Sequence, residues 1–426
     1  MISSLLLASC LLVAQSEPAT AAADLGPKVK RLLRQLDDEE LARREAAEKE
    51  LIALGPAISD HLPVPSAKLE SGVKERLARI RRALENQAVE KAGKASLVTL
   101  KGEMTLAEAI AEIEKQTGNL LVDYREKFNQ ESRPVTLKLD LKDKPFWEAL
   151  DAILDQAQMT IYNYGPTANT LALVSRAEDE RDRATRAVYA GPLRFEGTRI
   201  EAVRELRSVK NNMLRLAVEV AWEPRLKPIA LFQPLDAVTA RDESNKPLVI
   251  DGREGEIEVD VNGDESASEF NVLLELPSRD VKKISKLGGE AFLLTPGKLE
   301  TFEFADLEKG RDVEQRRAGV TVVLERARKN VDVYDVRIRV KFDDAANALE
   351  SHRGWIYGNP AYMLDASGDE IQNSGYEATR QATDEVGVSY KFVLDKGLAG
   401  HKFVYKTPAA ILKLPIKYEL RDIELP

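Results

Sequence analysis

The sequence is very poor in cysteine and histidine, and this limits the chemistry it can carry. Its 426 residues include one cysteine, Cys10, and three histidines, His61, His352 and His401. A single cysteine permits no disulfide within the chain, so the hydrophobic cores must be stable without cross-links. The histidines are scattered and form no HExxH or comparable spacing, which argues against a histidine-built metal site. We therefore predict neither a metal ion nor a cofactor.

The common catalytic motifs are also missing. The sequence has no GxSxG, no P-loop and no GxGxxG. Residues 260–264 (DVNGD) resemble the start of a calcium loop, but Glu265 stands where that loop requires glycine. An Asn-Gly hairpin turn is the preferred interpretation of this stretch. No catalytic residue is predicted, although a carboxylate pair assembled from distant positions, as in glycosidases, stays open as an alternative.

Positive charge is in the minority, which bears on the class of partner. The net charge is −9, with 62 basic and 71 acidic residues. A general nucleic-acid binder needs a basic surface to displace counterions from phosphates, so we predict no nucleic-acid partner. The chain is 43% apolar and too long for one ordinary domain, since domains average about 150 residues. We expect a multidomain protein of mixed fold class.

The first 23 residues are predicted to be a signal peptide. Residues 5–14 form an apolar run too short to span a bilayer, and small residues at 19–23 suit cleavage. The protein is therefore predicted to be exported, to the periplasm or the cell surface. Leu7-Ala8-Ser9-Cys10 resembles a lipoprotein box, so lipidation of Cys10 is the alternative, and only then would the protein attach peripherally to a membrane.

Residues 24–92 are predicted to form a small helical segment. Four acidic residues at 37–40 precede an amphipathic stretch that Gly55-Pro56 ends, and a further helix is expected over 73–84. The sequence REAAEKELIALGPA, within residues 37–60, resembles a HEAT-type repeat. A solenoid needs several such repeats to bury its faces, so one repeat indicates a helical cap or docking arm.

Residues 96–176 give the sharpest pattern, predicting the order β-α-β-β-α-β-β. Thr105 and Glu108 form a capping box at the start of one helix, Gly118 ends it, and Pro145 opens the second helix. Strand periodicity is clean over 135–141. The predicted core has residues from both helices and this strand: Ile110, Ile113, Leu137, Leu139, Leu150 and Ile153. Trp147 is expected to pack between helix and sheet, with a partner-facing anchor as the alternative.

This α/β module resembles the short N-terminal domain shared by secretins and TonB-dependent receptors. The residues that carry the resemblance are TLAEAIAEIEKQTGNLLVDY and RPVTLKLDLKDKPFWEALDAILDQAQMTIY. In that family the domain docks against protein partners in the periplasm, so the resemblance implies a protein-contact module. No outer-membrane barrel and no TonB box accompany it here, so it does not imply secretion or iron uptake.

Beyond a polar linker at 177–187, the pattern predicts two tandem β-sandwiches, at 188–310 and 311–426. Alternation of apolar and polar residues is clear over 214–222 and 336–342. The two halves are predicted to be copies of one duplicated unit, because four blocks recur in the same order. The matching blocks are 242–248 with 365–371, 287–292 with 398–403, Thr295-Pro296 with Thr407-Pro408, and 302–308 with 418–424. Gly289 and Gly400 are interpreted as equivalent positions that need unusual backbone angles.

The one candidate binding site is an aromatic loop in the second sandwich. Trp355, Tyr357 and Tyr362 lie in a stretch bounded by glycine and proline, and aromatic rings on loops suit recognition. The alternative is that Trp355 plugs the end of its sandwich and Tyr357 packs on the sheet.

These patterns favour a non-catalytic envelope protein that acts as a protein-interaction or binding scaffold, with an envelope protein as its partner. A structural component of a surface assembly is the first alternative. A carbohydrate-active or other hydrolase with an unrecognised site is the second.

Export predicts that the leader is removed from the native protein. Mass spectrometry of the protein isolated from its producing cell should find an N-terminus between Ser16 and Leu25, because the apolar run ends in small residues there. An intact Met1, or a lipid-modified Cys10, would contradict this prediction.

Overall fold

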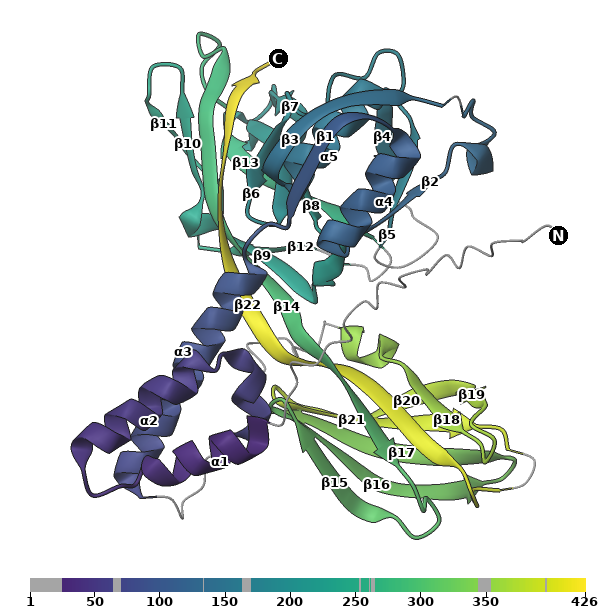
Figure 1. Ribbon diagram of the computed structural model, residues 1–426. Coiled ribbons are helices and arrows are strands. Elements are labelled where there is room, and N and C mark those ends of the chain that lie inside the picture. Colours follow the sequence, from purple (N-terminus) through teal and green to yellow (C-terminus); the bar gives the residue numbers. More distant parts are fainter. Residues whose placement is uncertain are drawn as a thin grey trace, which may run out of the picture. The chain divides into compact units, whose positions relative to one another are not determined.

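The chain has a mixed α and β fold with several separate sheets. The computed structural model describes residues 25–63, 70–132, 134–162, 170–252, 254–259, 261, 265–343, 354–394 and 397–426 (Figure 1). The predicted leader lies outside these ranges, as does most of the calcium-like stretch 260–264. The chain divides into two compact units, Met1–Glu85 and Asn86–Pro426.

The first unit is helical. Its elements are α1 (Leu25–Gln35), α2 (Leu41–Ala53), the 3-10 helix η1 (Pro56–His61) and most of α3 (Ser71–Ala92). Helix α2 gives way to η1 at Gly55, whose φ of 76° few other residues adopt. Arg76 and Arg79 of α3 both pair with Glu48 of α2, at 2.6 and 2.7 Å, and the hydrogen bond from Arg79 helps to hold the pKa of Glu48 below its usual value. These contacts join two helices whose apolar faces already share one core.

The α/β module that follows has the predicted order of elements. They are β1 (Leu97–Thr105), α4 (Leu106–Thr117), β2 (Leu120–Asp123), β3 (Thr136–Pro145), α5 (Phe146–Ala157), β4 (Met159–Tyr162) and β5 (Thr170–Ser175). The capping box is present, since Thr105 accepts from the Glu108 amide and Glu108 accepts from the Thr105 amide. Gly118 ends α4 in the left-handed conformation. Local capping chemistry therefore fixes this helix as the sequence indicated.

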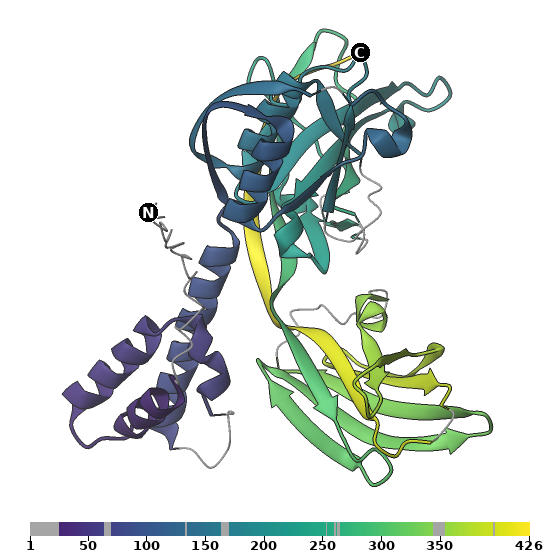
Figure 2. The same ribbon diagram turned by 45° about the vertical axis from the view of Figure 1, so that its right-hand side comes forward.

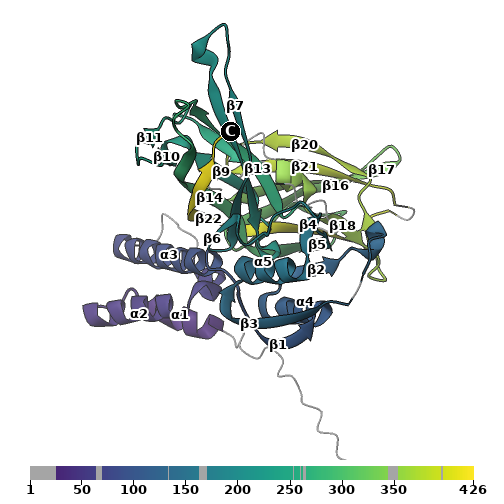
Figure 3. The same cartoon turned by 90° about the horizontal axis from the view of Figure 1, so that it is seen from above.

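The strands of this module form two sheets. β1 pairs only with β3, and the other sheet has the order β2-β5-β4, with β2 and β5 parallel. A two-stranded ribbon twists more strongly than a wide sheet, and β3 curves around α5 in Figure 1. Helices α4 and α5 lie side by side (Figure 3), and their buried faces meet both sheets in one core. Of the six predicted core residues, Ile110 is partly buried and the other five are buried.

The remaining strands build two antiparallel β-sandwiches. The first has a four-stranded sheet of order β13-β8-β7-β6 and the second a five-stranded sheet of order β15-β16-β17-β21-β20. A sheet of order β11-β10-β14-β22-β18-β19, with β9 and β12 attached, serves both. The strands are β6 (Ala187–Ala190), β7 (Leu193–Val203), β8 (Met213–Trp222), β9 (Ala230–Pro234), β10 (Thr239–Asp242), β11 (Pro247–Leu248), β12 (Glu256–Val259), β13 (Ala267–Glu275), β14 (Lys283–Phe304), β15 (Arg311–Arg317), β16 (Val320–Asn330), β17 (Val333–Phe342), β18 (Ala361–Leu364), β19 (Glu370–Gln372), β20 (Gly375–Gln381), β21 (Glu385–Phe392) and β22 (Lys402–Glu424).

Two long strands join the sandwiches. β14 and β22 pair antiparallel from Lys283↔Glu424 to Phe304↔Phe403, and Figure 2 shows them running together from one sandwich into the other. The last third of the chain therefore contributes to both cores. Leu414 and Leu420 of β22 pack in the first core, whereas Phe403 and Tyr405 of the same strand pack in the second. The prediction that the sandwiches follow one another in sequence, at 188–310 and 311–426, is therefore wrong. Each sandwich contains part of β14 and part of β22.

Prolines mark the stretch where this ribbon has no neighbours. Leu294 accepts a hydrogen bond from Ile229, and Lys406 donates one to Pro360, so these two residues face outward from the ribbon. Two positions further along each strand stand Pro296 and Pro408. Proline has no amide hydrogen to give, and it is tolerated in strands where the outer edge is unpaired. The Thr-Pro blocks of the sequence therefore occupy corresponding places in β14 and β22.

The other predicted repeat blocks agree only in part. Asp242 accepts from the amides of Ser244 and Lys246, and Asp365 accepts in the same way from those of Ser367 and Asp369, so the two turns are alike. Asp306 and Asp422 share a φ of 52°.

The glycine block does not agree with the predicted repeat. Gly400 lies in a turn with φ 75°, whereas Gly289 lies inside β14, where a Cβ would fall 2.6 Å from the Tyr418 hydroxyl. The predicted equivalence of Gly289 and Gly400 is wrong. Glycine suits position 400 because φ is positive there, whereas it suits position 289 because a side chain would collide with Tyr418.

Replacing Leu150 with alanine tests the core of the α/β module. Leu150 is 0% exposed and packs among both helices and the sheets. We expect Leu150→Ala to lower the free energy of unfolding by about 2–5 kcal/mol, because truncation leaves a cavity. Chemical denaturation of the full chain measures this change. A loss below about 0.5 kcal/mol, which is typical of surface positions, would contradict the assignment.

Candidate functional site

The structure separates the three predicted aromatic residues. Trp355 and Tyr357 lie on the short helix η6 (Gly354–Gly358), and Tyr362 lies on β18. Trp355 is half-buried and meets Phe342 edge-on at a ring distance of 6.0 Å, at the margin of the second core. Tyr362 is only 8% exposed. Tyr362 is therefore not a surface contact, because its ring is almost fully buried and the Lys406 ammonium lies 5.4 Å from the ring centre.

Tyr357 belongs to a column of tyrosines that the sequence did not indicate. Its ring stacks parallel to that of Tyr376 at 5.5 Å, and Tyr376 is 51% exposed. Tyr390 and Tyr405 continue the column inward and are buried. Burial raises the pKa of Tyr390, and it raises the pKa of Tyr405 to about 12. The aromatic surface offered to a ligand is thus Tyr357 with Tyr376, while the deeper rings pack the sandwich.

The most concentrated polar chemistry lies instead where the α/β module meets the first sandwich. Asp151 of α5 is 0% exposed and receives Arg183 on one oxygen at 2.8 Å. Its other oxygen receives Arg194 of β7 at 2.7 Å and the hydroxyl of Tyr189 at 3.0 Å. Burial, and then the facing Asp151 carboxylate, raise the pKa of Tyr189, so this phenol stays protonated and donates. One buried carboxylate therefore collects donors from three segments of the chain.

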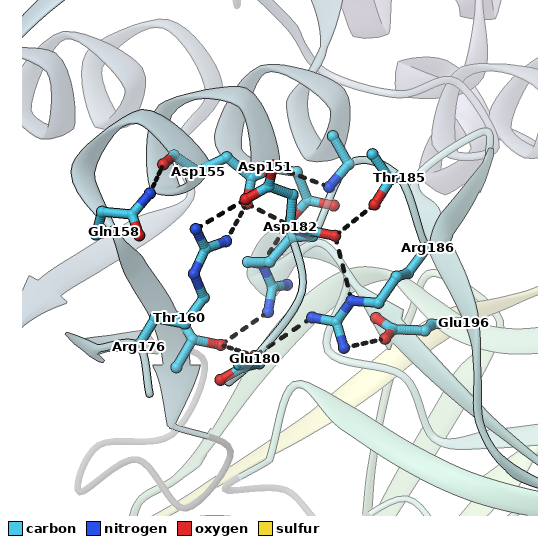
Figure 4. Close-up of polar contacts among 12 residues, drawn as sticks. Asp151, Asp155, Gln158, Thr160, Arg176, Glu180, Asp182, Thr185, Arg186 and Glu196 are labelled. Atoms are coloured by element: carbon cyan, nitrogen blue, oxygen red, sulfur yellow. Dashed lines mark hydrogen bonds and ion pairs between the residues drawn. The ribbon is translucent and has the colours of Figure 1, made fainter. Parts of the chain in front are cut away.

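A second layer of charge surrounds this centre. Asp155, one turn further along α5, receives Arg176 at 2.6 Å and the amides of Arg183 and Ala184 (Figure 4). Arg186 reaches Glu196 of β7 at 2.8 Å, and Figure 4 shows it between Glu196 and Glu180. We call the eight residues Asp151, Asp155, Arg176, Arg183, Arg186, Tyr189, Arg194 and Glu196 the Asp151 network.

The Asp151 network shows that the polar linker predicted at 177–187 packs against α5. Arg183 is 6% exposed, and its guanidinium and backbone amide both bind acids of α5. From the sequence, a run of charged residues is expected to be exposed to solvent. The sequence pattern does not show that acidic residues of α5 face this run. The polar composition here builds a contact between modules.

A second group of polar contacts, centred on Glu223 and called here the Glu223 hub, connects the same two modules. Glu223, which follows β8 and is fully buried, accepts from the amide and hydroxyl of Ser96 and from the side chains of Asn119 and Arg225. Trp147 adds a bond from its indole nitrogen to the Pro192 carbonyl at 3.1 Å and is 1% exposed. Trp147 is thus a packing residue, as preferred from the sequence, and not a partner-facing anchor.

The chemistry of these clusters suits fixation of the modules. The Asp151, Asp155, Glu196 and Glu223 carboxylates each bind at least one arginine at 2.6 to 2.8 Å. A general acid or base needs a carboxyl that can reach a substrate, whereas the oxygens of these four groups are already bound by arginines and other donors of the chain. Over the described ranges no group of histidine, cysteine and acidic side chains is arranged to hold a metal ion.

Two hollows of the surface lie over strands of the sandwiches, and Tyr189 of the Asp151 network lines the first of them. A groove of about 580 Å³ crosses β14 and β22 beside β6, with Gly288, Gly289 and Thr239 in its lining. A second hollow of about 510 Å³ lies over β15, β16 and β17 and is lined mainly by charged residues. Among the described helices, none has the length and apolar content to span a bilayer.

Asp151→Ala tests whether the network holds the modules together. The change leaves Arg183 and Arg194 buried without their shared counter-charge, and breaking such a pair costs about 3–5 kcal/mol. Asp182→Ala is the matched control, because Asp182 also pairs with an arginine but is 59% exposed, and should cost less than about 1 kcal/mol. Equal losses for the two variants in urea unfolding would show that the network does not carry this role.

Comparisons of the chain with protein-family models, with curated protein sequences and with solved structures gave no match. The functional conclusion therefore depends on the chain's own residues and geometry.

Proposed function

We propose that this protein is an exported, non-catalytic scaffold of the cell envelope that binds another envelope protein. The α/β module and the helical segment make the protein contact, and the paired sandwiches form a stiff platform that carries them. The proposal takes up the resemblance of residues 96–176 to the short N-terminal domain of secretins and TonB-dependent receptors.

The observation that carries the proposal is the way the α/β module is held. The Asp151 network and the Glu223 hub clamp it to the first sandwich at two separate places, through residues nearly or fully buried. A module held at two buried polar sites keeps a fixed orientation on its neighbour. A fixed orientation suits a module that presents a surface, and it would be unnecessary for one tethered by a free linker.

Apolar side chains remain exposed on the clamped module. Leu120 and Val122 alternate along the edge strand β2 and are 51% and 40% exposed, and Phe128 nearby is 42% exposed. Edge strands with exposed apolar residues are prone to pair with other chains, and folded proteins usually protect them. Here Glu114 takes the outward amide of Leu121, while the apolar side chains stay uncovered. These residues are the proposed contact with the partner.

The duplication of the sandwiches is part of the same proposal. Its support is the pair of matching aspartate turns at Asp242 and Asp365 and the shared φ at Asp306 and Asp422. A duplicated unit whose two long strands pair with each other gives a platform built on one continuous ribbon.

Site-specific photo-crosslinking in the producing cell tests the proposed contact. A photoreactive phenylalanine analogue at Val122 should give one adduct of discrete mass with a different protein, because this side chain would lie in the interface. The same analogue at Lys101, an exposed residue of β1 in the same module, is the control and should give none.

Two results would contradict the proposal. An adduct of two copies of this chain at Val122 would favour the structural-assembly alternative. Equal adducts, or none, at the two positions would show that β2 has no specific partner.

A further inference from the structure

Three arginines stand directly opposite one another in the second sandwich. Arg311 of β15 pairs in register with Arg326 of β16, and Arg326 pairs with Arg337 of β17. Adjacent strands lie about 4.8 Å apart, so three guanidinium groups start from neighbouring points of one sheet. We call these three residues the arginine ladder.

Like charges placed directly opposite on neighbouring strands destabilise a sheet. The nearest carboxylate only partly offsets this ladder. Glu325 lies 2.6 Å from Arg337, but its other oxygen lies 2.7 Å from Arg339, so its charge is shared with an arginine outside the ladder. Arg339 in turn reaches Glu385, which also receives Arg380.

Two arginines of the ladder and the neighbouring Arg328 have no acidic partner among the described residues. Within the described part of the chain, Arg311, Arg326 and Arg328 are exposed and form no ion pair or side-chain hydrogen bond. In the Asp151 network, by contrast, every arginine binds a carboxylate. Three acidic residues, Glu308, Asp312 and Glu325, lie close by, and of these described residues only Glu325 forms an ion pair with an arginine of the ladder.

The ladder opens into a hollow. Arg311, Arg326, Arg328 and Arg337 line the hollow of about 510 Å³, together with Glu308, Asp312 and Glu325. Two backbone irregularities shape it, a register shift between Leu324 and Arg326 and a φ of 52° at Asp312. Such bulges redirect side chains from the regular alternation of a strand, and here they bring several charged residues to one hollow.

We propose that the arginine ladder binds a ligand with two or more oxyanion groups. A guanidinium presents a planar fork of donors that matches phosphate, sulfate and carboxylate oxygens, and such bonds are stronger than neutral ones. Three forks at strand spacing fit neighbouring anionic groups better than a single ion. The ligand would also relieve the repulsion within the ladder. This site lies on the five-stranded sheet and does not depend on the proposed protein contact at β2.

Neighbouring oxyanion groups occur in small polyphosphates and along acidic polysaccharides, and calorimetry with both distinguishes these sources. The probes are sodium tripolyphosphate and polygalacturonate, each titrated into the full chain at low ionic strength. Binding of tripolyphosphate supports a small anion as ligand, and binding of polygalacturonate alone supports an acidic polymer. Affinity should fall as salt is added, because the attraction is between exposed charges. Failure of both probes to bind would overturn the proposal.

Arg326→Gln tests the central residue of the ladder. Affinity should fall by about tenfold or more, since a charge-assisted hydrogen bond is lost. Arg207→Gln is the control, because Arg207 is an exposed arginine between β7 and β8 outside the hollow. The melting temperature of Arg326→Gln should not fall, because its removal relieves like-charge repulsion. Affinity equal to that of the unchanged chain, or an equal loss in Arg207→Gln, would overturn the proposal.

Discussion

The pairing of β14 with β22 is the constraint on which the rest of the second unit depends. Each strand takes part in both sandwiches, so neither core can form completely until residues more than a hundred positions apart have paired. Closing such a long loop costs conformational entropy before any contact offsets it. The cost is offset because one pairing event positions apolar residues for two cores. The middle of the ribbon, which holds Pro296 and Pro408, pairs with no other described strand, and the two sandwiches share the sheet that contains it.

The polar clusters have a different physical role. Buried ion pairs lose much of their attraction to desolvation, so the Asp151 network adds less stability than its number of bonds suggests. What it supplies is orientation: Arg183, Arg194 and Tyr189 must all face one carboxylate, and only one placement of the α/β module on the sandwich allows this. The Glu223 hub imposes the same condition at a second point. Apolar packing alone, as in the contact of Ala221 and Ala267 with the module's core, would tolerate more sliding.

Arginine residues occur in two different environments in this chain. At the boundary of the modules, arginines are buried against acids and fix structure. On the five-stranded sheet, arginines are exposed and opposed to one another, which costs stability unless a further anion is present. The contrast between these two environments is the basis for assigning binding to the second group and not to the first.

The local elements could be predicted from the amino-acid sequence, because their signals act over a few residues. The capping box at Thr105, the helix end at Gly118 and the apolar spacing around Leu150 all rest on contacts within one or two turns, and the structure has them. The aspartate turns were likewise visible in the sequence, since a side chain there bonds to amides two and four residues ahead.

Which segments of the chain meet could not be predicted in this way. A charged run such as 177–187 has the same pattern whether it is solvated or faces complementary acids, and Tyr362 has the same pattern whether its strand is covered or open. Gly289 and Gly400 matched in sequence although one meets a tyrosine ring across the sheet and the other turns the chain. The register that aligns Arg311, Arg326 and Arg337 depends on strand pairing and on the register shift between Leu324 and Arg326, which no periodicity reveals. These features depend on partners distant in sequence, and long-range pairing is where local propensity carries no information.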